Sequence, residues 1–395
     1  MKNHTYDDVT YPEKQPHFSL VKENWDWLPF MFICIIIGLV CFGLIILYSA
    51  SYDEAIRHGL ASSYYFSRQL LFALLGFIVF IIIRWIPLLW IRRSIPYLLL
   101  LSFVLMILTL VTPWGVERLG ARRWLQIGPL PSFQPSELLK VSAVLYIAHI
   151  LSKWDRRSFL PIGISIAVVL TSALLIVIQR DYSTTLIFLL VTLALLAIGG
   201  LRLRYIGMFT IGVGTPAALF LFIEPYRIRR MVSFLFPTID PSGLNWQVRK
   251  SLEAIRAGGF WGKGLGNGVF KLGIIPEVQS DFIFASLAEE LGFAGIIFFF
   301  LLFSGFAFLG FSTARRFYTK HPEHLFIALA SFGITFMILW QALVNLAVVT
   351  ALLPPTGIPL PFFSQGGTNL FMMLCECGFL YKCMVLDEKE LAVYA

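Results

Sequence analysis

Long apolar runs, separated by short polar segments, follow one another along almost the whole chain. Runs of about 20 apolar residues are long enough to cross the ~30 Å hydrocarbon core of a bilayer as α-helices. We predict ten such spans, at residues 28–50, 66–86, 94–113, 137–152, 160–178, 183–199, 204–223, 282–310, 325–350 and 364–384. The pattern therefore predicts an all-α polytopic membrane protein, with one bundle of about ten transmembrane helices across residues 28–384.

The composition excludes a soluble protein of this length. Of the 395 residues, 58% are hydrophobic and only 14% are charged, whereas a soluble domain carries about a quarter charged residues. All five cysteines fall in predicted spans and none in a polar loop: Cys34, Cys41, Cys375, Cys377 and Cys383. Cysteines in such positions predict small packing residues and argue against a disulfide framework.

The distribution of Lys and Arg among the short loops predicts which end of the bundle faces the cytoplasm. An even number of spans places both termini on one side. The short loops on that side hold eleven Lys and Arg residues and those on the other side hold six, so the positive-inside rule places both termini in the cytoplasm. We therefore predict cytoplasmic tails at 1–27 and 385–395, with no cleavable signal peptide, and one long extracytoplasmic segment at 224–281.

The long segment is itself rich in basic residues. It contains Arg227, Arg229, Arg230, Arg249, Lys250, Arg256, Lys263 and Lys271. Long segments cross the membrane despite their charge, so the predicted topology stands. The excess indicates either an anionic ligand, which Arg side chains bind well, or a solvated loop facing lipid headgroups. Within the segment, residues 243–257 place Val248, Leu252 and Ile255 at helical spacing, which predicts a short amphipathic helix at the membrane interface.

Two polar islands precede this segment. The first, at 120–140, is rich in Gly, Pro and Trp and predicts an ordered, turn-rich loop, after which Pro135 suits the first turn of a helix. Glu137 and Lys140 are three residues apart, so they share one helical face and can pair. Ionisable residues inside a span are functional candidates, and a structural ion pair explains them equally well. The second island, at 179–181, is typical of a charge pair at a tight turn.

Two later islands carry most of the candidate chemistry. Six glycines within 258–268 allow close backbone approach to a ligand, without the Gly-Lys-Ser/Thr ending of a P-loop. Asp281 then stands directly before the apolar run that begins at Phe282, where a helix N-cap is an alternative role. The last island, 354–370, holds four prolines and three glycines, and such rigid backbone is tolerated at membrane depth only where it packs against protein or lines a cavity. Together the islands predict a site for an amphiphilic anionic substrate on one side of the membrane.

Several of these segments resemble the signatures of the SEDS (shape, elongation, division, sporulation) family, in the same order among the spans. They are GARRW at 120–124, QPSELLK at 134–140, GKGLGNG at 262–268, PEVQSDFIFASLAEELGF at 276–293 and TGIPLPFFSQGG at 356–367. YSASY at 48–52, SSYYFSRQ at 62–69 and RIRRMVSFLFP at 227–237 are closer to the division type, FtsW, and its sporulation relative SpoVE than to the elongation type, RodA.

The resemblance implies a peptidoglycan glycosyltransferase that polymerises lipid II into glycan strands and releases polyprenyl pyrophosphate. Asp281 occupies the position of the family's presumed catalytic aspartate. A carboxylate base would help a sugar hydroxyl to attack, and cationic groups would stabilise the pyrophosphate leaving group. The substrate-binding candidates on the matching motifs and the long segment are Arg122, Arg123, Glu137, Lys140, Arg227, Arg230, Lys263, Gln279, Ser364 and Gln365.

The chain departs from the family pattern at a few positions near these motifs. Gln279 and Ser280 replace the usual His-Thr before the aspartate, Gln365 replaces a usual Tyr, and Lys250 replaces a usual Gln. None of these changes removes the carboxylate of Asp281. The missing imidazole indicates that this chain works without it and predicts an altered rate or pH response.

Two other functions fit the sequence less well. A flippase for the lipid-linked precursor needs polar residues throughout the depth of the bundle, whereas here they gather on one side. A non-catalytic division scaffold would not need the dense Gly-Pro loops. The resemblance implies lipid II as substrate, a class B penicillin-binding transpeptidase and other division-complex membrane proteins as partners, and the bacterial inner membrane at the septum as the location. We expect no nucleic-acid partner and no fixed metal site, with a divalent cation, Mg²⁺ or Mn²⁺, bridging Asp281 and pyrophosphate as an option.

Overall fold

In the part of the chain that the structure describes, nine long helices form the bundle. The computed structural model describes residues 27–118, 120–129, 131–154, 160–202, 204–208, 210–212, 244–320, 324–386 and 391. The bundle helices in this part are α1 (Leu28–Arg57), α2 (Tyr64–Trp85), α3 (Leu88–Val111), α4 (Pro135–Ser152), α5 (Leu160–Ile178), α6 (Tyr182–Ile198), α10 (Ile283–Lys320), α11 (Leu325–Val349) and α12 (Gly367–Met384). Each coincides with a predicted span, which confirms the all-α polytopic fold class.

Not every bundle helix is equally apolar. By length and composition, six helices are able to cross a membrane: α1, α2, α3, α5, α10 and α11. The helix α6 is apolar but shorter, and both α4 and α12 carry charged residues within their length. Helical residues at 204–208 and 210–212 begin the predicted span 204–223, and the rest of that span lies outside the described residues.

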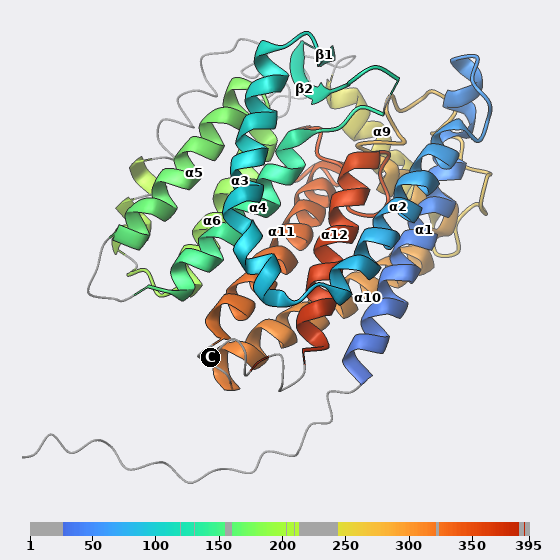
Figure 1. Cartoon of the computed structure of the whole chain (residues 1–395). Helices are drawn as coiled ribbons and strands as arrows, with labels where there is room; N and C mark the ends of the chain where they lie inside the picture. Colours follow the sequence, from blue (N-terminus) through green and yellow to red (C-terminus); the bar gives the residue numbers. More distant parts are fainter. Residues whose placement is uncertain are drawn as a thin grey trace, which may run out of the picture.

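Two elements outside the bundle gather at one of its ends. A short antiparallel hairpin, β1 (Gly115–Arg118) and β2 (Ala121–Leu125), forms where the sequence predicts an irregular loop. The amphipathic helix α9 (Leu244–Gly258) confirms the predicted helix at 243–257. Figure 1 shows the hairpin and α9 at the same end of the molecule, where α12 begins.

The face of α9 that packs against the bundle differs slightly from the predicted one. Val248, Ser251 and Ala254 are buried, whereas Leu252 and Ile255 are half-buried. Ser251 Oγ donates a hydrogen bond to the backbone oxygen of Val349 at the end of α11, over 2.7 Å. This small polar residue therefore lets α9 lie close to the bundle.

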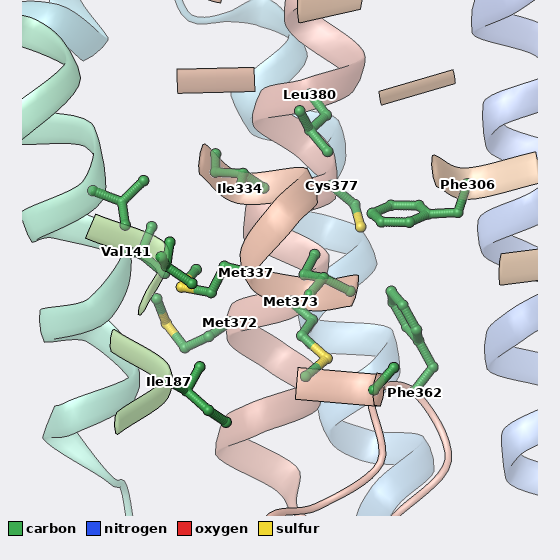
Figure 2. Packing of buried hydrophobic residues seen from close by; sticks show 14 of the residues in the cluster. Val141, Ile187, Phe306, Ile334, Met337, Phe362, Met372, Met373, Cys377 and Leu380 are labelled. Atoms are coloured by element: carbon green, nitrogen blue, oxygen red, sulfur yellow. The ribbon is translucent and has the colours of Figure 1, made fainter. Parts of the chain in front are cut away.

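The core is continuous across the bundle. Figure 2 shows Val141 of α4, Ile187 of α6 and Met337 of α11 converging, and Cys377 of α12 pointing toward Phe306 of α10. All five cysteines are free thiols: Cys377 and Cys383 are buried as predicted for packing residues, whereas Cys34 and Cys41 of α1 are exposed on the outside of the bundle. Apolar side chains of every size fill the space between helices, so the polar groups described next stand out as exceptions.

Candidate functional site

Asp281 lies at the end of the bundle that carries the hairpin and α9. It is half-buried and stands two residues before the first residue of α10, Ile283. Its backbone N–H donates to the oxygen of Glu277 over 3.1 Å, which closes a turn. A methyl group built on Gly357 would lie 3.7 Å from Asp281 Oδ2. The Pro-rich segment 354–366 therefore passes directly beside the carboxylate.

The Pro-rich segment is also hydrogen-bonded to the backbone of the two residues that precede Asp281. Gln365 N–H donates to the oxygen of Gln279 over 2.9 Å, and Ser364 Oγ donates to the oxygen of Ser280. The same Ser364 Oγ accepts the N–H of Leu360 over 2.8 Å. Three predicted substrate-binding residues, Gln279, Ser364 and Gln365, thus come together beside Asp281, where their described bonds hold the chain in place.

Two buried side-chain amides on α11 donate hydrogen bonds to the backbone of the Pro-rich segment. Asn345 Nδ2 donates to the oxygen of Ile358 over 2.7 Å and to the oxygen of Asp281 over 2.9 Å. Gln341, one turn earlier, donates to the oxygen of Pro359 over 3.0 Å. Because irregular backbone away from water needs partners for its polar groups, these amides make the segment's path possible.

A third buried amide reaches the segment from α2. Gln69 Nε2 donates to the oxygen of Ser364 over 3.1 Å, and Gln69 Oε1 accepts the N–H of Gly366 over 3.1 Å. Sequence reasoning missed Gln69, Gln341 and Asn345. The signal was present in Gln341 and Asn345, two amides four residues apart in an otherwise apolar span, where a polar side chain needs a partner.

The centre of the Pro-rich segment is anchored in the aromatic core. The ring of Phe363 lies 5.2 Å from the rings of both Phe42 and Phe299. Phe362 has a left-handed backbone, with φ of 66°, and its oxygen faces Gly43 of α1. A Cβ atom on Gly43 would lie 2.2 Å from that oxygen, so only glycine permits this approach.

The predicted pair of Glu137 and Lys140 is present and buried in α4. Lys140 Nζ lies 3.0 Å from Glu137 Oε1 and 3.4 Å from Gln341 Oε1. Asn369 Nδ2 of α12 donates to Glu137 Oε2 over 2.8 Å. Glu376 of α12 is also buried and interacts electrostatically with both charges. Gln341 thereby connects the buried ion pair to the Pro-rich segment beside Asp281.

The arginines of the hairpin join it to the turn between α5 and α6. Arg123 Nη1 lies 3.8 Å from Asp181 Oδ1, and its Nη2 donates to the oxygen of Arg180 over 2.6 Å. Arg180 in turn donates to the oxygen of Gly120 over 3.1 Å. The charge pair predicted within 179–181 therefore forms instead between Asp181 and Arg123.

The other hairpin arginine and the start of α6 complete this side of the site. Arg122, half-buried, donates from Nη1 to the oxygen of Leu110 over 3.2 Å. Asp181 caps α6 by accepting the N–H of Thr184 over 3.3 Å. Ser183 Oγ donates to the oxygen of Thr356 over 2.8 Å. Hydrogen bonds thus connect the hairpin, the start of α6 and the Pro-rich segment that passes beside Asp281.

The glycine-rich loop approaches its own protein closely. Glu289 of α10 is fully buried and lies 2.7 Å from Lys263 Nζ, and it accepts the N–H groups of Val269 and Phe270 over 2.8 and 3.1 Å. A Cβ atom on Gly262 would lie 2.2 Å from the oxygen of Glu290. Gly258 and Gly262 therefore allow close contact with the backbone of α10. Lys263 is paired with Glu289, and 32% of its side chain is exposed.

The neighbouring carboxylate binds a different part of the loop. Glu290, also fully buried, accepts Lys271 Nζ over 2.7 Å, Ser49 Oγ over 2.7 Å and the N–H of Gly266 over 3.2 Å. We call Glu289, Glu290, Lys263, Lys271 and Ser49 the carboxylate clasp. It fixes the loop to α10 and α1.

Two predicted substrate-binding residues and a possible metal site remain to be located. Arg227 and Arg230 lie outside the described residues. Within the part of the chain that the structure describes, no group of three His, Cys, Asp or Glu side chains is arranged to hold a metal ion.

The family can now be assigned. The model of the family described as cell cycle protein, which groups FtsW, RodA and SpoVE, matches residues 29–389. The chain belongs to this family. This assignment agrees with the sequence motifs found at the hairpin, the carboxylate clasp and the Pro-rich segment.

Individual relatives extend over nearly the same length. FtsW of Borreliella burgdorferi, named a probable peptidoglycan glycosyltransferase, is 35% identical over 88% of this chain and 94% of its own length. The stage V sporulation protein E of Bacillus subtilis is 36% identical over 89% of this chain and 95% of its own length. These similarities agree with the motifs that resemble the division and sporulation types.

Solved structures share the fold. A chain in a peptidoglycan synthase complex, described as coordinating polymerization and crosslinking, matches with a TM-score of 0.73 at 25% identity, over 91% of this chain and 98% of that chain. RodA of Thermus thermophilus, a rod shape determining protein, matches with a TM-score of 0.66 at 24% identity, over 93% of this chain and 99% of its own. The bundle is thus that of a multi-pass membrane protein of this family.

Proposed function

We propose that this chain is a peptidoglycan glycosyltransferase that polymerises lipid II into glycan strands, with Asp281 as the general base. The observation that carries the proposal is the framework around Asp281. Hydrogen bonds from the hydroxyl of Ser364, the backbone N–H of Gln365 and the side-chain amide of Asn345 hold the backbone at Asp281 beside the Pro-rich segment. Relatives that are about 35% identical and named as peptidoglycan glycosyltransferases support the same activity.

The chemistry follows from the groups present. In each cycle, a sugar hydroxyl attacks the anomeric carbon of a second unit, and the bond from that carbon to the pyrophosphate oxygen breaks. Asp281 would accept the hydroxyl proton as the new glycosidic bond forms. The departing pyrophosphate carries negative charge, which cationic groups stabilise. Arg122 and Arg123 on the hairpin are the described candidates for this role, and Arg227 and Arg230 are further candidates.

The remaining candidates divide into two groups by their contacts. Gln279, Ser364 and Gln365 hold the backbone beside Asp281, so we assign them to positioning of the aspartate. Glu137 and Lys140 form a buried pair that reaches the site through Gln341. Lys263 is engaged by Glu289, so substrate would have to compete with a buried carboxylate for its ammonium group.

The cellular setting is also part of the proposal. We infer that the termini and short basic loops face the cytoplasm, that 224–281 lies outside, and that the protein acts in the inner membrane at the division septum. The solved relative in a peptidoglycan synthase complex supports a class B penicillin-binding transpeptidase as partner, beside other division-complex membrane proteins. A divalent cation, Mg²⁺ or Mn²⁺, that bridges Asp281 and pyrophosphate stays a prediction.

Purified protein in lipid nanodiscs, supplied with fluorescent lipid II, tests the activity. We expect a ladder of glycan chains on a gel, formed with or without an added transpeptidase. A parallel assay in proteoliposomes measures movement of fluorescent lipid II between leaflets. Transport of lipid II without any polymer would contradict the proposal and favour a flippase, and neither activity would favour a scaffold.

A further inference from the structure

The helix α10 is too long to lie entirely within a bilayer. The helix is interrupted at Gly292, and its residues from Phe293 to Lys320 alone correspond to about 42 Å at ~1.5 Å per residue, whereas the hydrocarbon core is about 30 Å thick. Arg315 and Arg316, near the end of α10 far from Asp281, mark one boundary of the core. About 20 residues from Arg315 toward Asp281 span that thickness, which places the second boundary close to Gly295.

The helix α1 gives the same level independently. About 20 residues from its first residue, Leu28, reach Tyr48. The next residue, Ser49, donates a hydrogen bond of 2.7 Å to Glu290 of α10, so this part of α1 lies level with the upper part of α10. Tyr48 and Tyr52 are exposed there, and tyrosine is enriched at membrane–water interfaces.

The glycine-rich loop runs along α10 at this level. The helix is interrupted at Gly292, where φ is 63°, and the next two N–H groups bond to the loop instead of to the helix. Phe293 N–H donates to Gly259 over 2.9 Å, and Ala294 N–H donates to Phe260 over 3.0 Å. The interruption therefore fixes the loop beside the residues that the span length assigns to the boundary.

The outer surface of the loop is apolar and aromatic. Trp261 is 78% exposed and Phe260 is 55% exposed, and their rings lie 4.9 Å apart. Phe260 also lies 5.8 Å from the ring of Phe293. Further large apolar side chains of the loop are exposed at Leu265, Val269 and Leu272. An apolar patch of this extent marks an interaction surface.

The carboxylate clasp holds the polar groups of the loop against α10, which leaves the apolar side chains on the outer surface. Glu289 and Glu290 take up the ammonium groups of Lys263 and Lys271 and three backbone N–H groups on the inner side of the loop. The charged side chains thus point to α10 while the apolar ones point away. Phe293 of α10, whose ring contacts Phe260, is exposed, and so are Ile297 and Leu301 one and two turns further along the same helix.

We propose that residues 259–272 form a membrane-interface anchor, seated in the leaflet on the Asp281 side, with Trp261 and Phe260 at the edge of the hydrocarbon. The occupant of the patch is lipid, because the patch is continuous with the apolar face of a helix that crosses the bilayer. The helical residues from Ile283 to the interruption at Gly292, about 15 Å of helix, then separate Asp281 from that edge. The anchor would set the height of the site over the membrane surface.

Spin-label depth measurement tests this directly. Single cysteines replace Trp261, Leu301 and His58 in a background without the five native cysteines, in nanodiscs of phosphatidylethanolamine and phosphatidylglycerol. Leu301 is the hydrocarbon reference on α10, and the exposed His58 beyond the end of α1 is the aqueous reference. We expect the label at 261 to relax more with oxygen than with a water-soluble nickel complex, at a depth between the two references.

Three results would overturn the proposal. The label at 261 could match the label at 58, which would place the loop in water. It could be shielded from both reagents in every preparation, or become shielded only when a co-purified protein is present, which would indicate a protein contact. Quenching by brominated lipid gives a second readout, since we expect the wild type to lose a larger fraction of its tryptophan fluorescence than Trp261→Phe, while the thermal stability of the two in detergent stays similar. Equal fractional quenching of the two proteins would contradict the proposal.

Discussion

Asn345 uses a single amide nitrogen to hold two segments that are far apart in sequence. It donates to the oxygen of Ile358 in the Pro-rich segment and to the oxygen of Asp281 before α10. Its side chain is almost fully buried, so no water replaces these bonds when they are lost. At the scale of the residue, the position of the proposed base therefore depends on a neutral side chain in α11.

Asn345→Leu should lower kcat for lipid II polymerisation by about 10- to 100-fold, because small displacements of a catalytic group are costly. KM should change little, since no substrate contact is removed. Thr335→Val is the matched control, because Thr335 is buried on the same helix and its hydroxyl bonds only to Ser331 among its described partners. Hydrogen exchange of 277–285 should rise in the Leu variant alone. Equal kcat in both variants would exclude the positioning role.

The carboxylate clasp makes a second prediction at this scale. Lys271→Met leaves Glu290 buried without its cation, which costs about 3–5 kcal/mol in the free energy of unfolding. Adding Glu290→Gln removes the unpaired charge and should restore most of that loss. Thermal unfolding in one detergent measures both variants. A double variant as unstable as Lys271→Met would show that the charge is not the cause.

The Pro-rich segment acts as one element that reaches from the aromatic core to the site. Phe362 and Phe363 fix its centre, and the amides of Gln69, Gln341 and Asn345 fix its two flanks. Irregular backbone is thus held as firmly as a helix would be. Displacement at the buried centre is transmitted to the backbone beside Asp281.

Gly43→Ala tests this transmission from α1. The added methyl group would collide with the oxygen of Phe362, and overpacking of a filled core costs about 1–3 kcal/mol. We expect lower stability together with reduced polymerisation, measured by thermal unfolding and by glycan length on a gel. Gly38→Ala on the same helix is the control, because its methyl group would meet Leu302 at an acceptable 3.4 Å. Normal activity of Gly43→Ala would show that the segment is not rigidly coupled.

The elements themselves were largely predictable from the sequence. The bundle helices were predictable because the length of an apolar run that crosses the bilayer is set by the bilayer thickness. The amphipathic spacing of apolar residues predicted α9. The Glu137–Lys140 pair followed from helical periodicity alone. The hairpin at 115–125 was missed because its strands are short and rich in Arg and Trp. The contact of Gly258 and Gly262 with α10 was missed because α10 lies further along the sequence and meets the loop only in the folded structure.

At the scale of the molecule, one end of the bundle carries the hairpin, α9, the carboxylate clasp and Asp281. The positive-inside bias predicts that this end faces outward. Cysteines replacing His58, at this end, and Lys153, at the other, both lie at exposed positions. In intact cells or spheroplasts, an impermeant maleimide should label the first and should label the second only after permeabilisation. The reverse pattern would invert the topology.

The central claim is that Asp281 accepts a proton during glycan polymerisation, and Asp281→Asn tests it most directly. The substitution keeps the size of the side chain and the hydrogen bonds of the backbone, and Asn caps a helix about as well as Asp. It removes only the proton acceptor, and general-base contributions are typically about 10²–10⁴-fold. We predict that the variant shows wild-type thermal stability and makes no long glycan chains from lipid II in the same detergent. A stable Asn variant that polymerises lipid II at nearly the wild-type rate would contradict the account.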